Sequence, residues 1–152
     1  MKNFELTLGS KDFLLQVAAD FPERKLKLLQ LLTDNKSFLL LDLADKKPIF
    51  KSGLTYMVLQ EKFSWEVKDF YCFDHFKLNT IEQKEFKQLQ KILLSDLKGY
   101  ILGQRLQQNF EFVLLSIWQS LPDYLAWKQQ NFFWTANTDL FNSRYSRIFK
   151  PV

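Results

Sequence analysis

The segment DFYCFDHFKL, residues 69 to 78, constrains the fold more than any other part of the sequence. It is rich in aromatic residues and free of Gly and Pro, which predicts a β-strand. Side chains alternate along a strand, and here both faces carry aromatic residues: Phe70, Cys72, Asp74 and Phe76 on one face, and Tyr71, Phe73, His75 and Lys77 on the other. Such a strand needs cover on both sides. We expect helices over one face and a second sheet over the other, as in a barrel.

The residues after this strand predict the element order β-α-β-β-α-β. Thr80 is the candidate N-cap of a helix, and Gly99 supplies its C-terminal stop. Ser120 and Pro122 are typical of the start of a second helix. The expected elements after 78 are a helix over 80–99, strands over 100–108 and 111–120, a helix from 120 to about 137, and a strand over 143–152. This order is the ferredoxin-like arrangement.

The first 66 residues predict a weaker version of the same plan. The expected elements are a strand, a helix, a hairpin-like pair of strands and a short helix, over 4–8, 10–21, 25–33, 37–44 and 53–60. We therefore predict an α+β protein with two parts, in which residues 1–66 complete the barrel and residues 67–152 form a ferredoxin-like domain. Because one chain then supplies both sheets, a monomeric pseudo-dimer is favoured, with a homodimer as the alternative.

Composition excludes several classes of function. The chain has 152 residues and is 47% hydrophobic, enough for one well-buried domain or for two halves that share a core. No apolar run approaches about eighteen residues, and the N-terminus lacks the features of a signal peptide, so we expect a soluble cytoplasmic protein without membrane contact. The net charge of +4 is modest, and basic residues alternate with acidic ones, which argues against nucleic-acid binding.

The reactive residues are few. Cys72 is the only cysteine and His75 the only histidine, so no intrachain disulfide is possible and a protein-only zinc or copper site is not expected. No paired carboxylates, Gly-rich phosphate loop or Ser/His/Asp grouping stands out. With a single His, most schemes of general base catalysis have a single candidate.

The second half, residues 67–152, resembles the antibiotic-biosynthesis-monooxygenase superfamily of dimeric α+β barrels, and in particular its haem-degrading members of the IsdG and HmoB type. LGSKDFLLQVAADFP and KSFLLLDLADKKPIFKSGLTYMVL are similar to the N-terminal extension of HmoB-type proteins and of the TRAP family. SRYSRIFKPV is similar to the C-terminus of the TRAP family. The resemblance covers nearly the whole chain and implies the same ferredoxin-like barrel.

Haem degraders of this superfamily use an Asn on the first strand of the domain, a Trp on the second helix and a His further along that ligates iron. By this resemblance Trp127 matches the helical Trp, Asn137 stands in the place of the His, and His75 in the place of the strand Asn. These three are the implied catalytic residues, and His75 is the candidate iron ligand. The implied haem-binding residues are His75, Trp127, Phe133, Asn137 and Arg144, the last of these for a propionate.

The candidate residues also have simpler interpretations as structural residues. Trp118 at the end of a strand is interpreted as core, and Trp127 either as core or as the wall of a site for a flat ligand. His75 is otherwise a hydrogen-bonded structural histidine, and Cys72 a small buried hydrophobe. Three functional hypotheses remain open. They are a haem-binding or haem-degrading protein, a non-catalytic binding or stress protein of TRAP type, and a cofactor-independent oxygenase acting on an aromatic compound.

Overall fold

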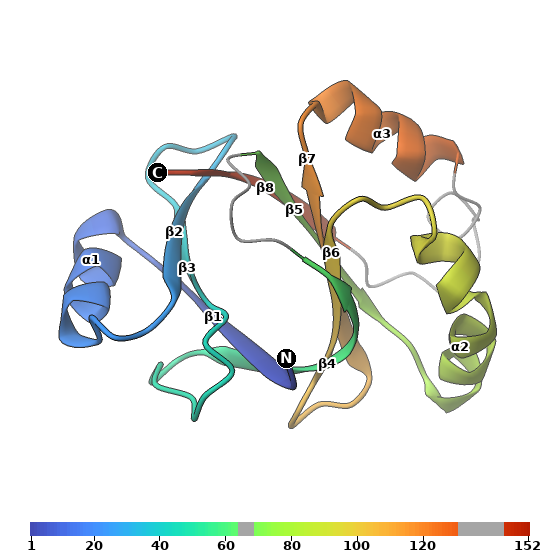
Figure 1. The fold of residues 1–152 in the computed structure, drawn as a ribbon, viewed down its shortest axis with the longest axis horizontal. Helices are drawn as coiled ribbons and strands as arrows, with labels where there is room; N and C mark the ends of the chain where they lie inside the picture. The colour runs from blue at the N-terminus through green and yellow to red at the C-terminus, as the bar shows by residue number, and fades with distance from the viewer. Residues whose placement is uncertain (64–68, 131–144) are drawn as a thin grey trace.

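The computed structural model describes residues 1–63, 69–130 and 145–152, and within them eight strands and three helices (Figure 1). The N-terminal half contains β1 (Asn3–Gly9), α1 (Lys11–Asp20), β2 (Leu26–Leu31), β3 (Phe38–Asp42) and β4 (Leu54–Lys62). The C-terminal half contains β5 (Phe70–Lys77), α2 (Thr80–Leu94), β6 (Tyr100–Arg105), β7 (Glu111–Trp118), α3 (Leu121–Gln130) and β8 (Tyr145–Pro151).

The strands close into one barrel in the order β1-β3-β2-β8-β5-β7-β6-β4, with every pair antiparallel. Each half forms one side, and the halves join where β2 pairs with β8 and where β4 pairs with β6. Within each half the strands lie in the order fourth, first, third, second, which is β4-β1-β3-β2 in the N-terminal half and β8-β5-β7-β6 in the C-terminal half. That is the order of a ferredoxin-like sheet, and it confirms the predicted α+β barrel built from two halves.

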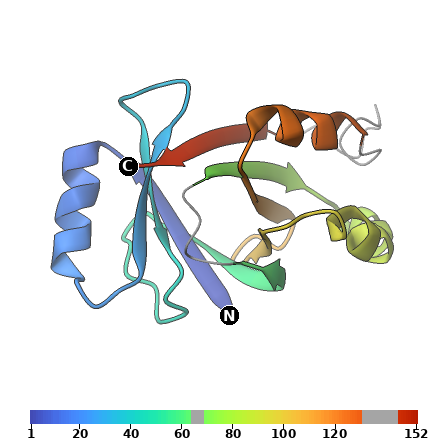
Figure 2. The same ribbon diagram turned by 45° about the horizontal axis from the view of Figure 1, so that its top comes forward.

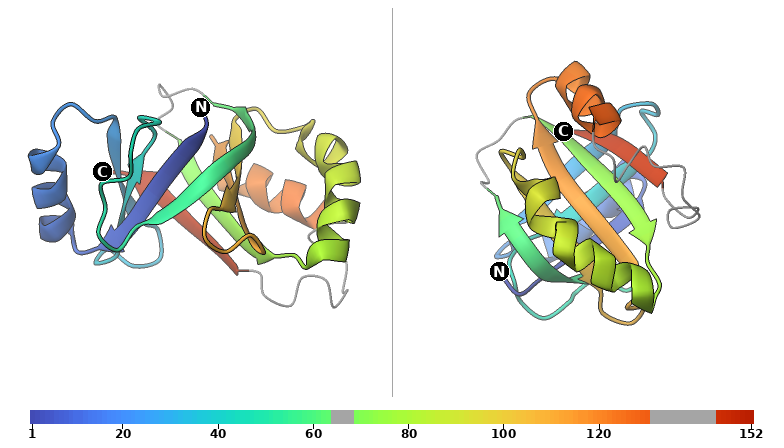
Figure 3. Two further views of the ribbon diagram at one scale, coloured as in Figure 1. Left: turned by 90° about the horizontal axis from the view of Figure 1, so that it is seen from below. Right: turned by 90° about the vertical axis from the view of Figure 1, so that its right-hand side faces the viewer.

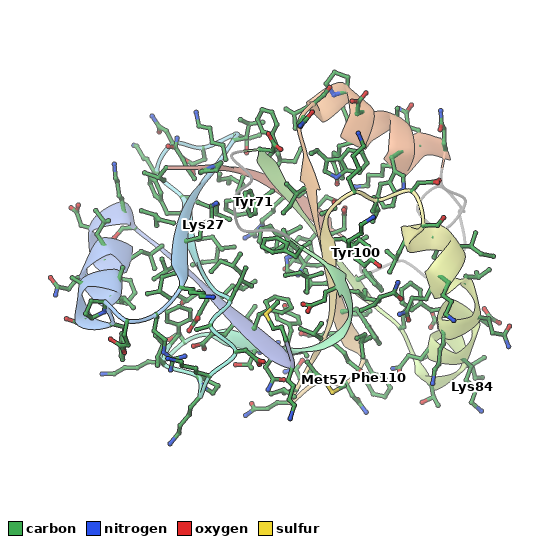
Figure 4. The ribbon with its side chains drawn as sticks, in the orientation of Figure 1. Lys27, Met57, Tyr71, Lys84, Tyr100 and Phe110 are labelled. Atoms are coloured by element: carbon green, nitrogen blue, oxygen red, sulfur yellow. The ribbon has the colours of Figure 1, made fainter. Side chains whose placement is uncertain are left out.

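Three apolar clusters account for the packing. The largest fills the barrel interior with inward-facing residues of both halves, including Phe4, Tyr71, Phe73 and Phe149. A second lies between the C-terminal sheet and α2 and α3, and a third lies under α1. Figures 2 and 3 show α1 on the outside of the N-terminal half and the other two helices over the C-terminal sheet. The side chains drawn in Figure 4 occupy the space that the ribbon leaves inside the barrel, Tyr71 among them.

Residues 54–62 form a strand, so the short helix predicted over 53–60 is wrong. Strand β4 pairs with β1 through Leu54 to Met57, and it pairs with β6 through Tyr56 to Lys62, with a bulge between Val58 and Gln60. Thr55, Tyr56 and Val58 also favour strand over helix. Backbone pairing on both edges therefore decides the conformation of a segment whose own pattern is ambiguous.

The first helix of the C-terminal half ends sooner than predicted, and its N-cap lies one residue before the predicted one. Its N-cap is Asn79, not Thr80, since the Asn79 side chain accepts a hydrogen bond from Glu82 N at 2.9 Å and the Glu82 carboxylate accepts one from Asn79 N at 3.2 Å. This reciprocal pair is a capping box. The helix ends at Leu94 with Ser95 as its C-cap, ahead of Gly99.

In the described residues no helix has the length and apolar character needed to cross a membrane.

Candidate functional site

His75 lies on the inner face of β5, at one end of the barrel. Its ring stacks on Tyr145 with the ring centroids 4.5 Å apart and on Phe73 with the centroids 6.3 Å apart. Burial lowers the pKa of His75 from its usual 6.5 to about 4, and the charge of Arg147 acts in the same direction, while Glu111 opposes it. His75 is therefore a neutral ring in an aromatic stack at pH 7.

Trp127 lies on α3, over the opposite face of the same sheet. It packs against the cluster that contains Phe76 and Leu114. His75 and Trp127 are thus separated by the sheet, and the structure does not bring them together as one site. The other predicted site residues, Phe133, Asn137 and Arg144, lie outside the described residues.

The β5 residue that faces α3 is Asp74, one position before His75. Asp74 is fully buried and accepts hydrogen bonds from the Tyr124 hydroxyl at 2.9 and 3.1 Å and from the Ser146 hydroxyl. Lys128 Nζ lies 3.1 Å from its carboxylate and also donates to Ser146. The network ties α3 and β8 to β5. Sequence matching missed Asp74 because a shift of one residue moves a side chain to the other face of a strand.

Two groups on this face, the Tyr124 hydroxyl and the Cys72 thiol, keep their protons at neutral pH. Burial raises the pKa of the Tyr124 hydroxyl, and the neighbouring Asp74 carboxylate raises it further. Burial likewise raises the pKa of the Cys72 thiol, with Asp74 again contributing. Tyr124 is therefore a phenol and Cys72 a thiol at neutral pH, and neither offers the anion that nucleophilic attack or metal ligation needs.

Aromatic rings fill the space between the C-terminal sheet and its helices. Phe76 packs on Phe86 and Phe112, each pair with ring centroids 5.5 Å apart. Trp118 lies 5.7 Å from both Tyr124 and Trp127 between ring centroids. The hole beside Trp127 that the described residues line measures only about 10 Å³.

On the helix-covered face of the C-terminal sheet, the described residues offer no suitable ligand for haem iron. His75 points to the other side of the sheet, and Tyr124 and Cys72 remain protonated. The described residues also contain no group of three or more His, Cys, Asp or Glu side chains arranged to hold a metal ion. We therefore derive no chemistry through haem iron.

A larger opening lies at the end of the sheet where β5 and β6 begin and β7 ends, next to the first turn of α3. It has a volume of about 390 Å³, and we call it the Trp118 cleft. The Trp118 indole N–H donates to Ser116 Oγ at 2.8 Å, so the indole nitrogen is already satisfied within the protein. The described residues that line this cleft are Asp69, Asp96, Lys98, Gly99, Ile117, Trp118, Gln119 and Asp123.

The sequence prediction placed Trp118 in the core, whereas its ring is half-buried and lines this cleft. The residues around it are far apart in the chain. Asp69 precedes β5, Asp96 and Gly99 lie between α2 and β6, and Asp123 is in the first turn of α3. Only the strand order β5-β7-β6 brings these ends together, so no local motif marks the site.

A second depression, of about 470 Å³, lies between α2 and strands β4 and β6. Its amide side chains already have partners in the protein. Gln83 donates to the carbonyls of Leu78 and Asn109, and Gln104 donates to the carbonyl of Asn109. These contacts make the depression a poorer candidate for a ligand site than the Trp118 cleft.

The fold of this chain is that of solved structures described as ferredoxin-fold proteins related to antibiotic-biosynthesis monooxygenases. A protein of that description from Listeria monocytogenes superimposes with a TM-score of 0.79 at 22% identity, covering 100% of this chain and 95% of its own. At this level of identity the likeness establishes the fold. No family model matches the sequence, and no curated protein matches it.

Two further solved structures share the fold and have names that describe a function. LmHde, a haem-degrading enzyme from Listeria monocytogenes, matches with a TM-score of 0.76 at 20% identity, over 98% of this chain and 99% of its own. A protein described as a major regulator of staphylococcal pathogenesis matches with a TM-score of 0.76 at 20% identity, over 99% of both chains. Proteins with different roles therefore have this barrel, and the site of each chain must decide its function.

Proposed function

We propose that this protein binds a flat small molecule in the Trp118 cleft and does so without haem iron. The observation that carries the proposal is the cleft itself, an opening of about 390 Å³ with an indole in its wall. Ligand sites in proteins commonly have volumes of about 300 to 1,000 Å³ and combine apolar walls with a few polar groups. The Trp118 cleft meets both conditions.

Ligand binding without catalysis is better supported than an enzymatic role. The buried polar groups near the cleft, Asp74 and Tyr124, are hydrogen-bonded to each other. Neither is left with an unmet partner that a reacting molecule would satisfy. The proposal therefore corresponds to a non-catalytic binding protein with the monooxygenase-type fold.

Calorimetric titration with 2-naphthol, 2-naphthoate and 2-naphthylmethylammonium tests the binding role. We expect at least one of the three to bind with one molecule per chain, and Trp118→Phe to weaken that binding by tenfold or more. Trp127→Phe is the matched control, because it alters the neighbouring indole of the same aromatic group and leaves the cleft wall in place. Equal losses in the two variants, or no binding of any probe to the wild type, would refute the proposed site.

Haem is the second candidate, and the likeness to the haem-degrading enzyme LmHde favours it. Titration with haemin, followed by absorption spectroscopy, separates it from the first. Our account expects no saturable Soret band at one haem per chain. A saturable band that is lost in His75→Ala would establish haem binding with His75 as the iron ligand, and a band that persists in this variant would require another ligand.

A further inference from the structure

We propose that the ligand of the Trp118 cleft is an organic cation whose flat apolar part lies on the indole. This inference rests on the proposed binding function and adds the charge of the ligand. Its basis is the distribution of ionisable side chains around the cleft. Among the described residues, three carboxylates, Asp69, Asp96 and Asp123, line it together with one cation, Lys98.

The negative charge of the cleft contrasts with the rest of the molecule. The chain as a whole carries a net charge of +4, whereas the described side chains that line the cleft, three Asp and one Lys, have a formal net charge of −2. Within the described residues none of the three carboxylates forms an ion pair. Uncompensated charges of one sign that line a concave surface raise the local concentration of counter-ions and of charged ligands of the opposite sign.

The start of α3 beside the cleft would ordinarily favour an anion. Unpaired backbone N–H groups and the helix dipole attract negative charge at a helix N-terminus. Here the Ser120 hydroxyl lies 3.5 Å from Asp123 N, and Asp123 itself supplies a carboxylate in the first turn. With Asp69 and Asp96 also facing this opening, an incoming phosphate or carboxylate meets like charges, so anionic ligands are disfavoured.

Trp118 contributes the apolar half of the recognition. Its N–H is already bonded to Ser116, so a ligand gains from contact with the ring and not from a hydrogen bond to the nitrogen. A cation over an indole face is stabilised by the ring quadrupole, by about 0.5 to 2 kcal/mol depending on how far it is desolvated. The site therefore combines an aromatic surface with anionic groups, as recognition of an aromatic amine requires.

Three probes with the same ring system test the charge preference. These are 2-naphthylmethylammonium, 2-naphthol and 2-naphthoate, titrated by calorimetry at pH 7 and low ionic strength. We expect the cation to bind about tenfold more tightly than the neutral phenol and the anion to bind most weakly. Raising the salt concentration should weaken binding of the cation and leave binding of 2-naphthol nearly unchanged, because salt screens charge and not ring contacts.

Charge-neutralising variants test whether the three carboxylates of the cleft cause the preference for a cation. Asp69→Asn, Asp96→Asn and Asp123→Asn combined should reduce affinity for the cation at least threefold and should not weaken binding of 2-naphthol. Asp12→Asn is the matched control, because Asp12 is also an exposed first-turn carboxylate but lies on α1 in the other half. It should leave all three affinities unchanged.

The outcomes separate this inference from the proposed function. If 2-naphthol or 2-naphthoate binds as tightly as the cation, and Trp118→Phe still weakens binding, the site stands and the cation preference is overturned. If affinity for the cation falls equally in the triple variant and in Asp12→Asn, the effect is one of overall charge, and the inference also fails. If no probe binds, the proposed function fails together with the inference.

Discussion

The position of His75 on β5 sets the pKa of its side chain and thereby the effect of pH on stability. On the inner face it is stacked between Phe73 and Tyr145, and its pKa is lowered to about 4. Because the folded state favours the neutral ring, its contribution to stability is complete above pH 6.5, the ordinary pKa of the unfolded chain. It is lost as the pH falls towards 4.

We predict that the free energy of unfolding depends on pH differently in the wild type and in His75→Phe. The variant keeps a ring in the stack but has no side chain that binds a proton. The wild type should lose at most roughly 3 kcal/mol of unfolding free energy through this group between pH 7 and pH 4, since one pKa unit is about 1.36 kcal/mol. Urea unfolding at pH 7, 5.5 and 4.5 measures it. Parallel pH profiles for the two proteins would show that His75 is not held neutral.

Asp74, one residue earlier, illustrates the limit of sequence matching at this scale. The sequence predicts that both faces of β5 need cover, but it does not show which residue of the strand meets α3. That depends on register, and here Asp74 meets Tyr124 on the helix side. The network around Asp74 joins residues 50 and 72 positions apart, and no local pattern indicates it.

Tyr124→Phe tests this network. Removing a hydrogen bond to a buried carboxylate costs about 1.5 to 3 kcal/mol, so the variant should lose roughly that amount of unfolding free energy in chemical denaturation. Tyr145→Phe is the control, because Tyr145 is half exposed. A loss in Tyr124→Phe no larger than in Tyr145→Phe would mean that the network contributes little to stability.

At the scale of elements, the helices of the C-terminal half follow from local signals and β4 does not. A cap followed by apolar residues at helical spacing predicts α2 to within a residue at its start, since Asn79 and Thr80 are both good capping residues. Strand β4 takes its conformation from pairing with β1 and β6, which come from different halves of the chain. A window of ten residues does not show this pairing, and the strand-favouring residues Thr55, Tyr56 and Val58 leave the local pattern of β4 ambiguous.

Strand β6 shows the same dependence on distant residues at Gly103. A Cβ atom at this position would lie 2.8 Å from Phe4 Cε1 and 2.9 Å from Tyr56 Cβ, in the stacked pair of rings that fills the barrel. We predict that Gly103→Ala destabilises the fold by about 1 to 3 kcal/mol through overpacking.

Gly99→Ala is the matched control for that measurement. A Cβ at Gly99 would make only ordinary contacts, the nearest at 3.6 Å to Ile117. Thermal unfolding of both variants should show a clear loss for position 103 and little change for position 99. Equal melting temperatures for the two variants would mean that the Phe4 and Tyr56 rings move aside without cost.

At the scale of the whole molecule, the two halves build a closed barrel from one chain. Each half alone would leave a sheet with an apolar inner face and two open edges, which the other half covers and pairs. The aromatic residues on both faces of β5 predicted cover on both sides, so a barrel could be predicted from the sequence. No such pattern marks the proposed ligand cleft.

Closure within one chain also predicts the oligomeric state. With no barrel edge left to pair, we expect a monomer of 18.2 kDa in sedimentation velocity at micromolar concentration. A species of twice that mass that persists on dilution would show that a further surface of the molecule mediates association.

The most direct test of our central claim, that the Trp118 cleft binds the ligand, is a two-dimensional ¹H–¹⁵N spectrum of the protein titrated with 2-naphthylmethylammonium. The indole signals of Trp118 and Trp127 are assigned from the Trp118→Phe and Trp127→Phe variants. We predict saturable shifts of the Trp118 indole and of the backbone amides of residues 96–99 and 117–119, which line the cleft or adjoin its lining. Shifts confined to Trp127 and the helix-covered face, or no saturable shifts, would contradict the claim.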